Sequence, residues 1–506
     1  MTARRSPAGR RTVAWLVAAA LAAACTGASD DRAEPTPSSS STTAAPRPTT
    51  TTEPPTTTTT VALPPPVPID WAGCGGGFQC ATVAVPVDYA DPGGATLELA
   101  LIRRPAGSPD RRIGTLLVNP GGPGASGVRR VRRGFTISAE VADRFDIVGF
   151  DPRGVGDSTP VSCGSTVAAF RGQDLDPDTP DEARALDAAA RAVADECAST
   201  EGDRLGHLGT VEVVHDIEVI RRDLGEVQIS FVGLSYGTLI ALLWADAYPG
   251  SVRAAVLDGV VDPAAGGDPT ALSQMKVIDE AVRAMDDACA ADSACPLTQQ
   301  GLRLLAAYDE LARRVETGEV AGHGVGPTQL VYAAFSATYG QERWPLLWQA
   351  VSDGLAGDLR GVADMAAWFT GLVTFAPFAL VTCLDSTHPV GFAEWEHDAD
   401  LAARLSPRFG RTAANELLPC AYWPAATRVP HSVEAAGAPP ILVLGSTGDV
   451  ATPYEQAQAV ARRLRSGALL TVDDAGHVAI GSSSCVGDAV TRYLVDLTVP
   501  TPGARC

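Results

Sequence analysis

A serine between two glycines is the residue of this 506-residue chain best suited to nucleophilic chemistry: Ser235, in residues 233–237 (GLSYG). The apolar run 229–232 predicts a buried strand before it, and the apolar run 238–248 predicts a helix after it, ended by Pro249. At a strand-to-helix turn, G-x-S-x-G forms a sharp elbow that exposes the hydroxyl and points the helix N-terminus at developing negative charge. The motif alone is weak in a chain with 50 glycines, but its position predicts that Ser235 is a nucleophile.

A serine nucleophile needs a base to remove its proton and a carboxylate to orient that base. Where the serine lies on such an elbow, the acid and then the histidine follow it along the chain. Asp449 follows the predicted strand 441–444 and His477 follows the predicted strand 468–472, so a Ser235–Asp449–His477 triad is predicted. The alternative is that Asp449 is only a turn residue and that His477 is only a surface-loop histidine. The other histidines lack this context and are interpreted as surface or core residues: His207, His215, His323, His388, His397 and His431.

The oxyanion that forms during acyl transfer needs backbone N–H donors. We expect these from Tyr236, the residue after the nucleophile, and from Gly122, in a glycine-rich loop after the predicted strand 115–119. Residues 122–127 also match the dinucleotide-binding pattern G-x-G-x-x-G. Two prolines stiffen this turn and the elbow explains the loop better, so nucleotide binding is disfavoured.

The elements that must position these residues alternate between strands and helices. The predicted strands are 81–87, 96–102, 115–119, 145–150, 229–232, 256–257, 441–444 and 468–472, and the predicted helices between them include 211–224, 455–465 and 486–496. This alternation predicts an α/β fold with a mostly parallel central sheet flanked by helices. Between residues 264 and 430 helical spacing replaces the strand pattern, at 272–289, 302–317 and 346–356, which predicts an inserted helical cap.

Composition and charge limit the classes of function. Apolar residues make up 45% of the chain and aromatic residues 6%, which is typical of a packed globular protein. The formal net charge of −20 (39 basic and 59 acidic residues) disfavours nucleic-acid binding.

The chain has eleven cysteines, and Cys25 stands apart from the other ten. Ten fall into neighbouring pairs, which in an exported chain indicates five disulfides. Sequential pairing is the prediction: Cys74 with Cys80, Cys163 with Cys197, Cys289 with Cys295, Cys383 with Cys420, and Cys485 with Cys506. Free buried thiols and a zinc site are the alternatives. Zinc is disfavoured because the sequence contains neither C-x-x-C nor H-E-x-x-H.

The N-terminal region predicts export. Residues 1–24 have a basic start and a short apolar run, typical of a signal peptide. The following segment LAAACTG resembles a bacterial lipobox, which implies lipidation of Cys25, although Ala22 stands where leucine is usual. An ordinary cleavable signal is the alternative, and Arg10-Arg11 leaves a twin-arginine route open. Residues 25–68 are rich in Ser, Thr and Pro and are expected to form a disordered tether. The hydrolase core would then comprise 69–263 and 431–506, with the cap at 264–430.

Five segments together resemble the α/β-hydrolase fold: NPGGPGASG, FDIVGFDPRGVGDS, GLSYGT, GSTGDVATP and DDAGHVAIG. More narrowly, residues 71–506 resemble secreted actinobacterial tripeptidyl aminopeptidases, relatives of prolyl aminopeptidase. Prolyl aminopeptidases usually have histidine before GGPG, whereas this chain has Asn119-Pro120, which fits the tripeptidyl branch. The resemblance implies that Ser235 is the nucleophile, Asp449 the orienting acid and His477 the base, with oxyanion donors at Gly122 and Tyr236.

The resemblance also implies a serine exopeptidase that acts on the free N-termini of peptides, without a metal or an organic cofactor. Such an enzyme must pair the substrate ammonium with a carboxylate of the cap. Asp385 is the first candidate because a disulfide at Cys383 would fix it, and Glu394 and Glu396 are the alternatives. A lipid anchor at Cys25 would make the membrane a partner. Two other functions stay open: a carboxylesterase or lipase with the same triad, and a non-catalytic surface binding protein on a hydrolase scaffold.

Overall fold

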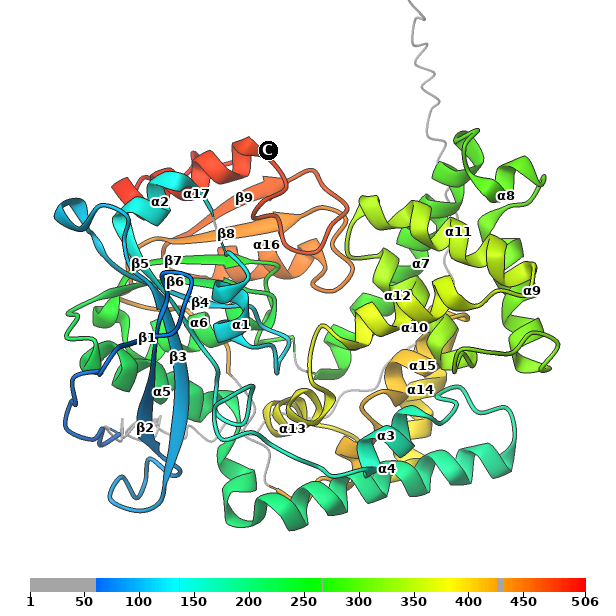
Figure 1. Ribbon diagram of the computed structural model, residues 1–506, viewed down its shortest axis with the longest axis horizontal. Coiled ribbons are helices and arrows are strands. Elements are labelled where there is room, and N and C mark those ends of the chain that lie inside the picture. The colour runs from blue at the N-terminus through cyan, green and yellow to red at the C-terminus, as the bar shows by residue number, and fades with distance from the viewer. Residues whose placement is uncertain (1–60, 136, 266, 426–430) are drawn as a thin grey trace, which may run out of the picture. The chain divides into compact units, whose positions relative to one another are not determined.

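The computed structural model of the chain describes residues 61–135, 137–265, 267–425 and 431–506 (Figure 1). The chain divides into two units, Met1–Thr59 and Thr60–Cys506, and the described residues all belong to the second. The predicted signal peptide, Cys25 and the tether up to residue 60 lie outside the described residues.

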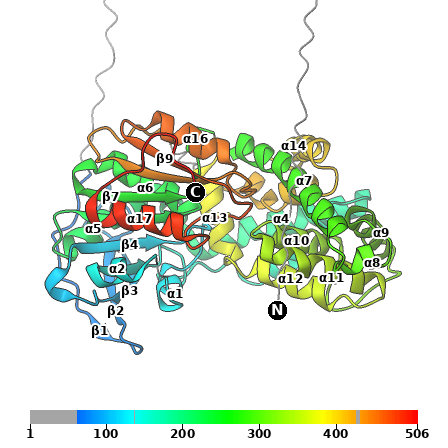
Figure 2. The same cartoon turned by 90° about the horizontal axis from the view of Figure 1, so that it is seen from above.

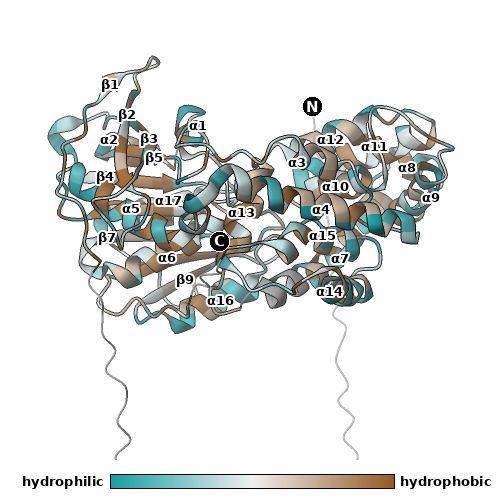
Figure 3. Ribbon diagram, turned by 90° about the horizontal axis from the view of Figure 1, so that it is seen from below, coloured by the Kyte–Doolittle hydropathy of each residue, from teal (hydrophilic) through white to brown (hydrophobic). Residues whose placement is uncertain are grey.

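One sheet forms the centre of this unit, in the order β1-β2-β3-β5-β4-β6-β7-β8-β9. Pairing is antiparallel from β1 to β5 and parallel from β5 onward. The strands are β1 (Ala72–Gly73), β2 (Gln79–Pro86), β3 (Thr96–Arg104), β4 (Gly114–Asn119), β5 (Phe145–Phe150), β6 (Ile229–Leu234), β7 (Val252–Asp258), β8 (Ile441–Ser446) and β9 (Gly467–Val472). Every residue of β4, β5, β6 and β8 is buried, and Figure 3 shows hydrophobic, brown stretches in the sheet. This burial requires helices on both faces.

Helices cover both faces of the sheet (Figure 2). On one face lie α1 (Gly127–Arg132), α2 (Ala139–Arg144) and α17 (Ser484–Asp496); on the other lie α5 (Thr210–Asp223), α6 (Tyr236–Ala247) and α16 (Tyr454–Arg463). The nine-stranded sheet with this covering confirms the predicted α/β-hydrolase fold. β7 begins at Val252, four residues before the predicted strand start, and α6 begins at Tyr236 instead of at residue 238.

The remaining α-helices form a second layer beside the sheet, which we call the cap (Figure 1). They are α3 (Thr166–Arg171), α4 (Pro180–Glu201), α7 (Gly267–Ala291), α8 (Pro296–Gln299), α9 (Leu304–Glu316), α10 (Pro327–Ala337), α11 (Trp344–Leu355), α12 (Arg360–Thr370), α13 (Phe375–Asp385), α14 (Phe392–Leu405) and α15 (Gly410–Asn415). Short 3-10 turns punctuate the fold: η1 (Pro109–Arg111), η2 (Gly202–His207), η3 (Pro249–Ser251), η4 (Gln341–Arg343) and η5 (Leu418–Tyr422).

Two of the cap helices, α3 and α4, lie within residues 69–263, which the sequence predicts to belong to the core. The segment with α3 and α4 follows β5, yet the Leu175 amide donates to Thr328 Oγ1 of α10 (3.0 Å), and Asn415 Nδ2 of α15 donates to the Leu175 carbonyl (2.9 Å). The cap therefore consists of two insertions. The predicted cap, which begins at residue 264, leaves out the first insertion. The helical spacing of α3 and α4 does not reveal whether these helices pack on the sheet or on the other cap helices.

The last residues assigned to the tether contact the core. The Val67 amide donates to Asp223 Oδ1 at 2.8 Å, and Arg222 Nη1 donates to the Pro64 carbonyl at 3.0 Å. Residues 61–68 thus lie against the end of α5, although they form no helix or strand. These eight residues are apolar, and Val61 and Leu63 also pack against the hydrophobic core, so the tether ends before residue 61 and not at residue 68.

Disulfides join the ten paired cysteines in the sequential order expected from the sequence. The five bonds are Cys74 to Cys80, Cys163 to Cys197, Cys289 to Cys295, Cys383 to Cys420, and Cys485 to Cys506. The second, third and fourth of these lie in the cap region, and the fourth connects α13 to η5. The predicted pairing is therefore confirmed for every pair, and the alternatives of free thiols and a zinc site are not supported at these cysteines.

Among the residues that the structure describes, no single helix is both long and apolar enough to cross a membrane. The consecutive helices α12 and α13 reach that length and hydropathy only together, with a bend of 50° between them.

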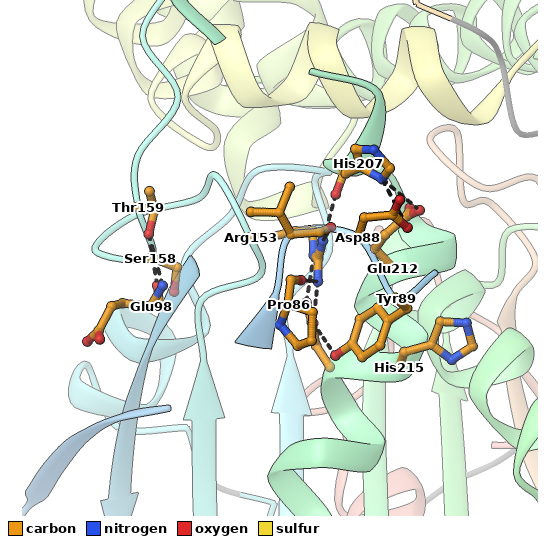
Figure 4. Close-up of polar contacts among 12 residues, drawn as sticks. Pro86, Asp88, Tyr89, Glu98, Arg153, Ser158, Thr159, His207, Glu212 and His215 are labelled. Atoms are coloured by element: carbon orange, nitrogen blue, oxygen red, sulfur yellow. Dashed lines mark hydrogen bonds and ion pairs between the residues drawn. The ribbon is translucent and has the colours of Figure 1, made fainter. Parts of the chain in front are cut away.

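A buried ion pair anchors the loop after β5. Figure 4 shows Arg153 of this loop among Pro86, Tyr89 and His207. The Arg153 guanidinium, fully buried, donates to both carboxylate oxygens of Asp216 on α5. It also donates to the carbonyls of Val87 (2.9 Å) and His207 (2.7 Å), and Tyr89 donates its hydroxyl to Asp216 at 2.8 Å. The DPRG motif therefore ties four segments of the chain together.

Replacing Arg153 with methionine should destabilise the fold, because Asp216 would stay buried without its ionic partner. We expect the free energy of unfolding to fall by about 3–5 kcal/mol, measured by chemical denaturation. Arg360→Gln removes an exposed ion pair with Asp358 and serves as the control, with an almost unchanged midpoint. Equal losses in the two variants would contradict the role of Arg153.

Candidate active site

The elbow holds Ser235 in a backbone conformation that non-glycine residues seldom adopt, with φ 54° and ψ −127°. β6 and α6 meet here, so the turn consists of the serine alone. A Cβ at Gly233 would lie 2.3 Å from the Gly237 carbonyl oxygen, and one at Gly237 would lie 2.5 Å from the Asn119 carbonyl oxygen. Only glycine fits at these two positions, which explains the spacing of the motif.

His477 is held by the carboxylate of Asp449. Its Nδ1 lies 2.9 Å from Oδ2 and 3.0 Å from Oδ1 of Asp449. Thr452 fixes this carboxylate by donating its hydroxyl to Oδ2 and its amide to Oδ1, each at 2.9 Å. The imidazole also packs edge-on against Tyr339, with ring centroids 5.5 Å apart. These contacts favour the tautomer with hydrogen on Nδ1, which leaves Nε2 as the basic nitrogen.

The electrostatic surroundings make His477 a stronger base. Burial alone would lower the pKa of His477, but the charge and the hydrogen bond of Asp449 outweigh it and hold that pKa above its usual value. The more distant carboxylate of Asp258 acts in the same direction. An imidazole of raised pKa accepts a proton more readily once it is neutral.

Asp258, the last residue of β7, connects the serine to the histidine loop. Its carbonyl oxygen accepts the Ser235 amide at 2.8 Å. Its buried carboxylate accepts the amides of Ala479 (2.8 Å) and Ile480 (2.7 Å), just after His477 in the chain. Burial raises the pKa of Asp258 to about 6. Sequence reasoning missed this positioning residue, whose only signal was a place at the end of a predicted strand.

The amides of Tyr236 and Gly122 are available to an oxyanion. Among the described residues neither N–H has an acceptor, and both residues line a cavity beside Ser235. The Gly121 amide is instead donated to Asn119 Oδ1 at 2.8 Å. A Cβ at Gly121 would lie 2.7 Å from the Tyr236 amide nitrogen, so glycine allows the loop to approach the elbow. Asn119 thus fixes the loop that carries Gly122.

The N-terminus of α1, where a dinucleotide pyrophosphate would bind, already holds a side chain. Asp151 Oδ1 accepts the Val128 amide at 3.0 Å and the Ser126 hydroxyl at 2.6 Å. The Ser126 hydroxyl in turn accepts the Arg129 amide at 3.0 Å. Because a carboxylate occupies the anion site of this helix, the geometry argues against the dinucleotide alternative.

Two cavities meet at Ser235. The larger, of about 730 Å³, is lined by Ser235, His477 and residues of α1 and α12. The smaller, of about 360 Å³, is lined by Ser235, Tyr236, Thr452 and residues of α7, α10, α13 and α15. Cap helices thus enclose the serine on the side opposite the sheet.

The three carboxylates proposed for amine recognition lie in different places. Asp385 lines the smaller cavity, where its carboxylate accepts the Thr210 amide (3.1 Å) and the hydroxyl of Tyr236. Burial raises the pKa of Asp385 to about 6, against the effect of these hydrogen bonds. Glu394 accepts the Val390 amide (3.2 Å), and Glu396 pairs with an arginine of α15 (3.1 Å). Neither glutamate lines a cavity that contains Ser235.

A further carboxylate, Glu416, lines both cavities. Burial raises its pKa, although Arg171 and a hydrogen bond with Tyr332 act in the opposite direction. Sequence reasoning missed Glu416, because no motif surrounds it. It also follows no predicted strand, which is the feature that marked Asp449 and His477. Among the residues that the structure describes, no group of three or more His, Cys, Asp or Glu side chains could hold a metal ion.

The pKa of His477 should govern the acid limb of the pH–rate profile. The base works only when neutral, so kcat/KM for a simple ester, which carries no amine, should fall as pH drops through a pKa higher than that of an ordinary histidine. Asp449→Asn removes the charge that raises this pKa, so kcat should fall about 10³- to 10⁴-fold and the residual limb should move to lower pH. If the acid limb of Asp449→Asn lies at the same pH as that of the wild type, the limb reports the titration of a group other than His477.

Comparisons with known proteins identify the family. Residues 406–506 match the family model described as TAP-like protein. The chain is 34% identical over 460 residues to tripeptidyl aminopeptidase of Streptomyces lividans, covering 84% of each chain. It is 34% identical over 489 residues to the serine protease Hip1 of Mycobacterium tuberculosis (87% of this chain, 91% of the relative), and 34% identical over 459 residues to carboxylesterase B of the same species (85% and 86%). The chain therefore belongs to the α/β-hydrolase family that contains these TAP-like enzymes, and it is a serine hydrolase.

Proposed function

We propose that this serine hydrolase is an exopeptidase that releases short peptides, tripeptides above all, from free N-termini. The observation that carries the proposal is the charge of the smaller cavity. Its wall contains three carboxylates, Asp262, Asp385 and Glu416, and none of the described residues that line it is basic. Asp262 is paired with Arg463, and the charge of Arg171 acts on Glu416, which leaves Asp385 as the first candidate to meet a substrate ammonium. The rest of the wall is mostly apolar and suits small side chains.

The proposed reaction uses the triad in two steps. Ser235 Oγ attacks the scissile carbonyl while His477 Nε2 takes the hydroxyl proton, and the amides of Gly122 and Tyr236 bind the oxyanion. His477 then gives this proton to the leaving amine as the C–N bond breaks, which leaves an acyl-enzyme. Water, deprotonated by His477, attacks the ester and releases the peptide. Asp449 keeps the imidazole oriented throughout.

Export and anchoring belong to the same proposal. Five disulfides are consistent with an oxidising compartment. The signal peptide of residues 1–24 and lipidation of Cys25 would place the enzyme on the outer face of the membrane, at the end of a tether. The substrates there would be peptides and protein N-termini.

Carboxylesterase activity is the second candidate. It is favoured by the apolar part of the cavity wall and by the relative named carboxylesterase B. Both functions use the same acyl-enzyme chemistry, so they differ only in whether the substrate amine contributes to binding.

Hydrolysis of a tripeptidyl fluorogenic amide, with its N-terminus free or acetylated, tests the proposal. We expect cleavage of the free form only, and none by Ser235→Ala. Asp385→Asn should lower kcat/KM for the free form about tenfold or more, chiefly through KM, because an ionic hydrogen bond to the ammonium is lost. Glu394→Gln, on the same cap but outside the cavity, is the matched control and should match the wild type.

Equal cleavage of the free and acetylated amides would contradict the exopeptidase. Cleavage of neither amide, with turnover of a simple ester that Ser235→Ala lacks, would favour the carboxylesterase. Near-ultraviolet circular dichroism of each variant shows whether a loss of activity accompanies a loss of fold.

A further inference from the structure

The larger cavity beside Ser235 differs in charge from the smaller one. Five arginines line it, Arg129, Arg130, Arg133, Arg171 and Arg343, against two glutamates. The chain as a whole carries a net charge of −20, so this basic wall is a local exception. A cluster of charges of one sign in a concave site raises the local concentration of ions of the opposite sign.

None of these arginines forms a short ion pair. In the described part of the chain, none of the five has a carboxylate within 4.0 Å, although Arg171 interacts electrostatically with Glu416 and Arg343 with Glu342. Arg343 is held in place by stacking on Trp368, 3.5 Å from the ring centroid, and its Nε donates to the Ser336 carbonyl at 2.7 Å. Its remaining guanidinium nitrogens stay available to a ligand.

The position of His477 assigns each cavity to one side of the scissile bond. His477 must protonate the leaving amine, and it is part of the wall of the larger cavity. Asp385 is part of the wall of the smaller cavity, which receives the substrate ammonium in the exopeptidase proposed above. The acyl part of the substrate therefore lies in the acidic cavity and the leaving group in the basic one.

We propose that the arginines of the larger cavity bind a carboxylate on the leaving group, an inference that rests on the exopeptidase function. The preferred substrates are peptides in which an anionic group lies close after the cleaved bond. This group is either the C-terminal carboxylate of a short peptide or the side chain of an acidic residue. Guanidinium groups suit such a ligand because their N–H donors match the two oxygens of a carboxylate.

Four peptides with the same free N-terminal tripeptide separate these sources. After the scissile bond they carry alanine amide, alanine with a free carboxylate, aspartate amide or lysine amide. We expect kcat/KM for the two anionic peptides to exceed that for alanine amide about tenfold, and lysine amide to be the slowest. Added salt should reduce the differences, because exposed charges are screened. Preference for only one anionic peptide identifies which carboxylate is bound.

Variants on α1 and at Arg133, the residue that follows it, connect the preference to the arginines. In the triple variant Arg129→Gln, Arg130→Gln and Arg133→Gln, the ratio of kcat/KM for the anionic peptides to kcat/KM for alanine amide should fall close to one. Arg132→Gln is the matched control: it lies on the same helix, but its guanidinium contacts the Cys74 carbonyl (3.3 Å) and lies outside the cavity wall. This variant should keep the preference.

Equal cleavage of the anionic and neutral peptides would overturn the arginine proposal and leave the exopeptidase intact. A preference that survives in both the triple variant and Arg343→Gln would overturn it as well. If none of the four peptides is cleaved while an ester is turned over, both proposals are wrong.

Discussion

The active site depends on hydrogen bonds made by one residue, Asp258. Its main chain accepts the amide of Ser235, and its side chain accepts two amides of the loop that follows His477. This arrangement requires the parallel pairing of β6 with β7, in which Leu234 lies opposite Asp258. A shift of this register by one residue would turn the carboxylate to the other face of the sheet and separate the base from the nucleophile.

The walls of the two cavities add a division of charge to this geometry. Carboxylates and no basic residue line the smaller cavity, and five arginines against two glutamates line the larger one, although the chain as a whole is strongly acidic. A peptide with a cationic N-terminus and an anionic leaving group would be oriented by both walls, before any contact with its side chains. Because complementary charge acts at a distance, it selects orientation more than it adds affinity.

The motifs predicted the fold because each is local in the sequence, and the triad is a prediction from the same motifs. A glycine two residues from a serine at a strand-to-helix turn, or an acid after a strand, indicates the same local structure in any chain with this fold. The surroundings of Asp385 could not be predicted, because its partners Thr210 and Tyr236 lie 175 and 149 residues away in sequence. The first cap insertion was missed for a related reason: helical spacing shows which face of α4 is apolar, but not which layer buries it.

Reaction with a fluorophosphonate, followed by peptide mapping, tests most directly whether the elbow and the histidine loop form one catalytic unit. We expect a single adduct, on Ser235, formed quickly by the wild type and far more slowly by His477→Ala with an intact fold. An adduct on another residue, or labelling of Ser235 at the same rate without His477, would contradict the proposed site.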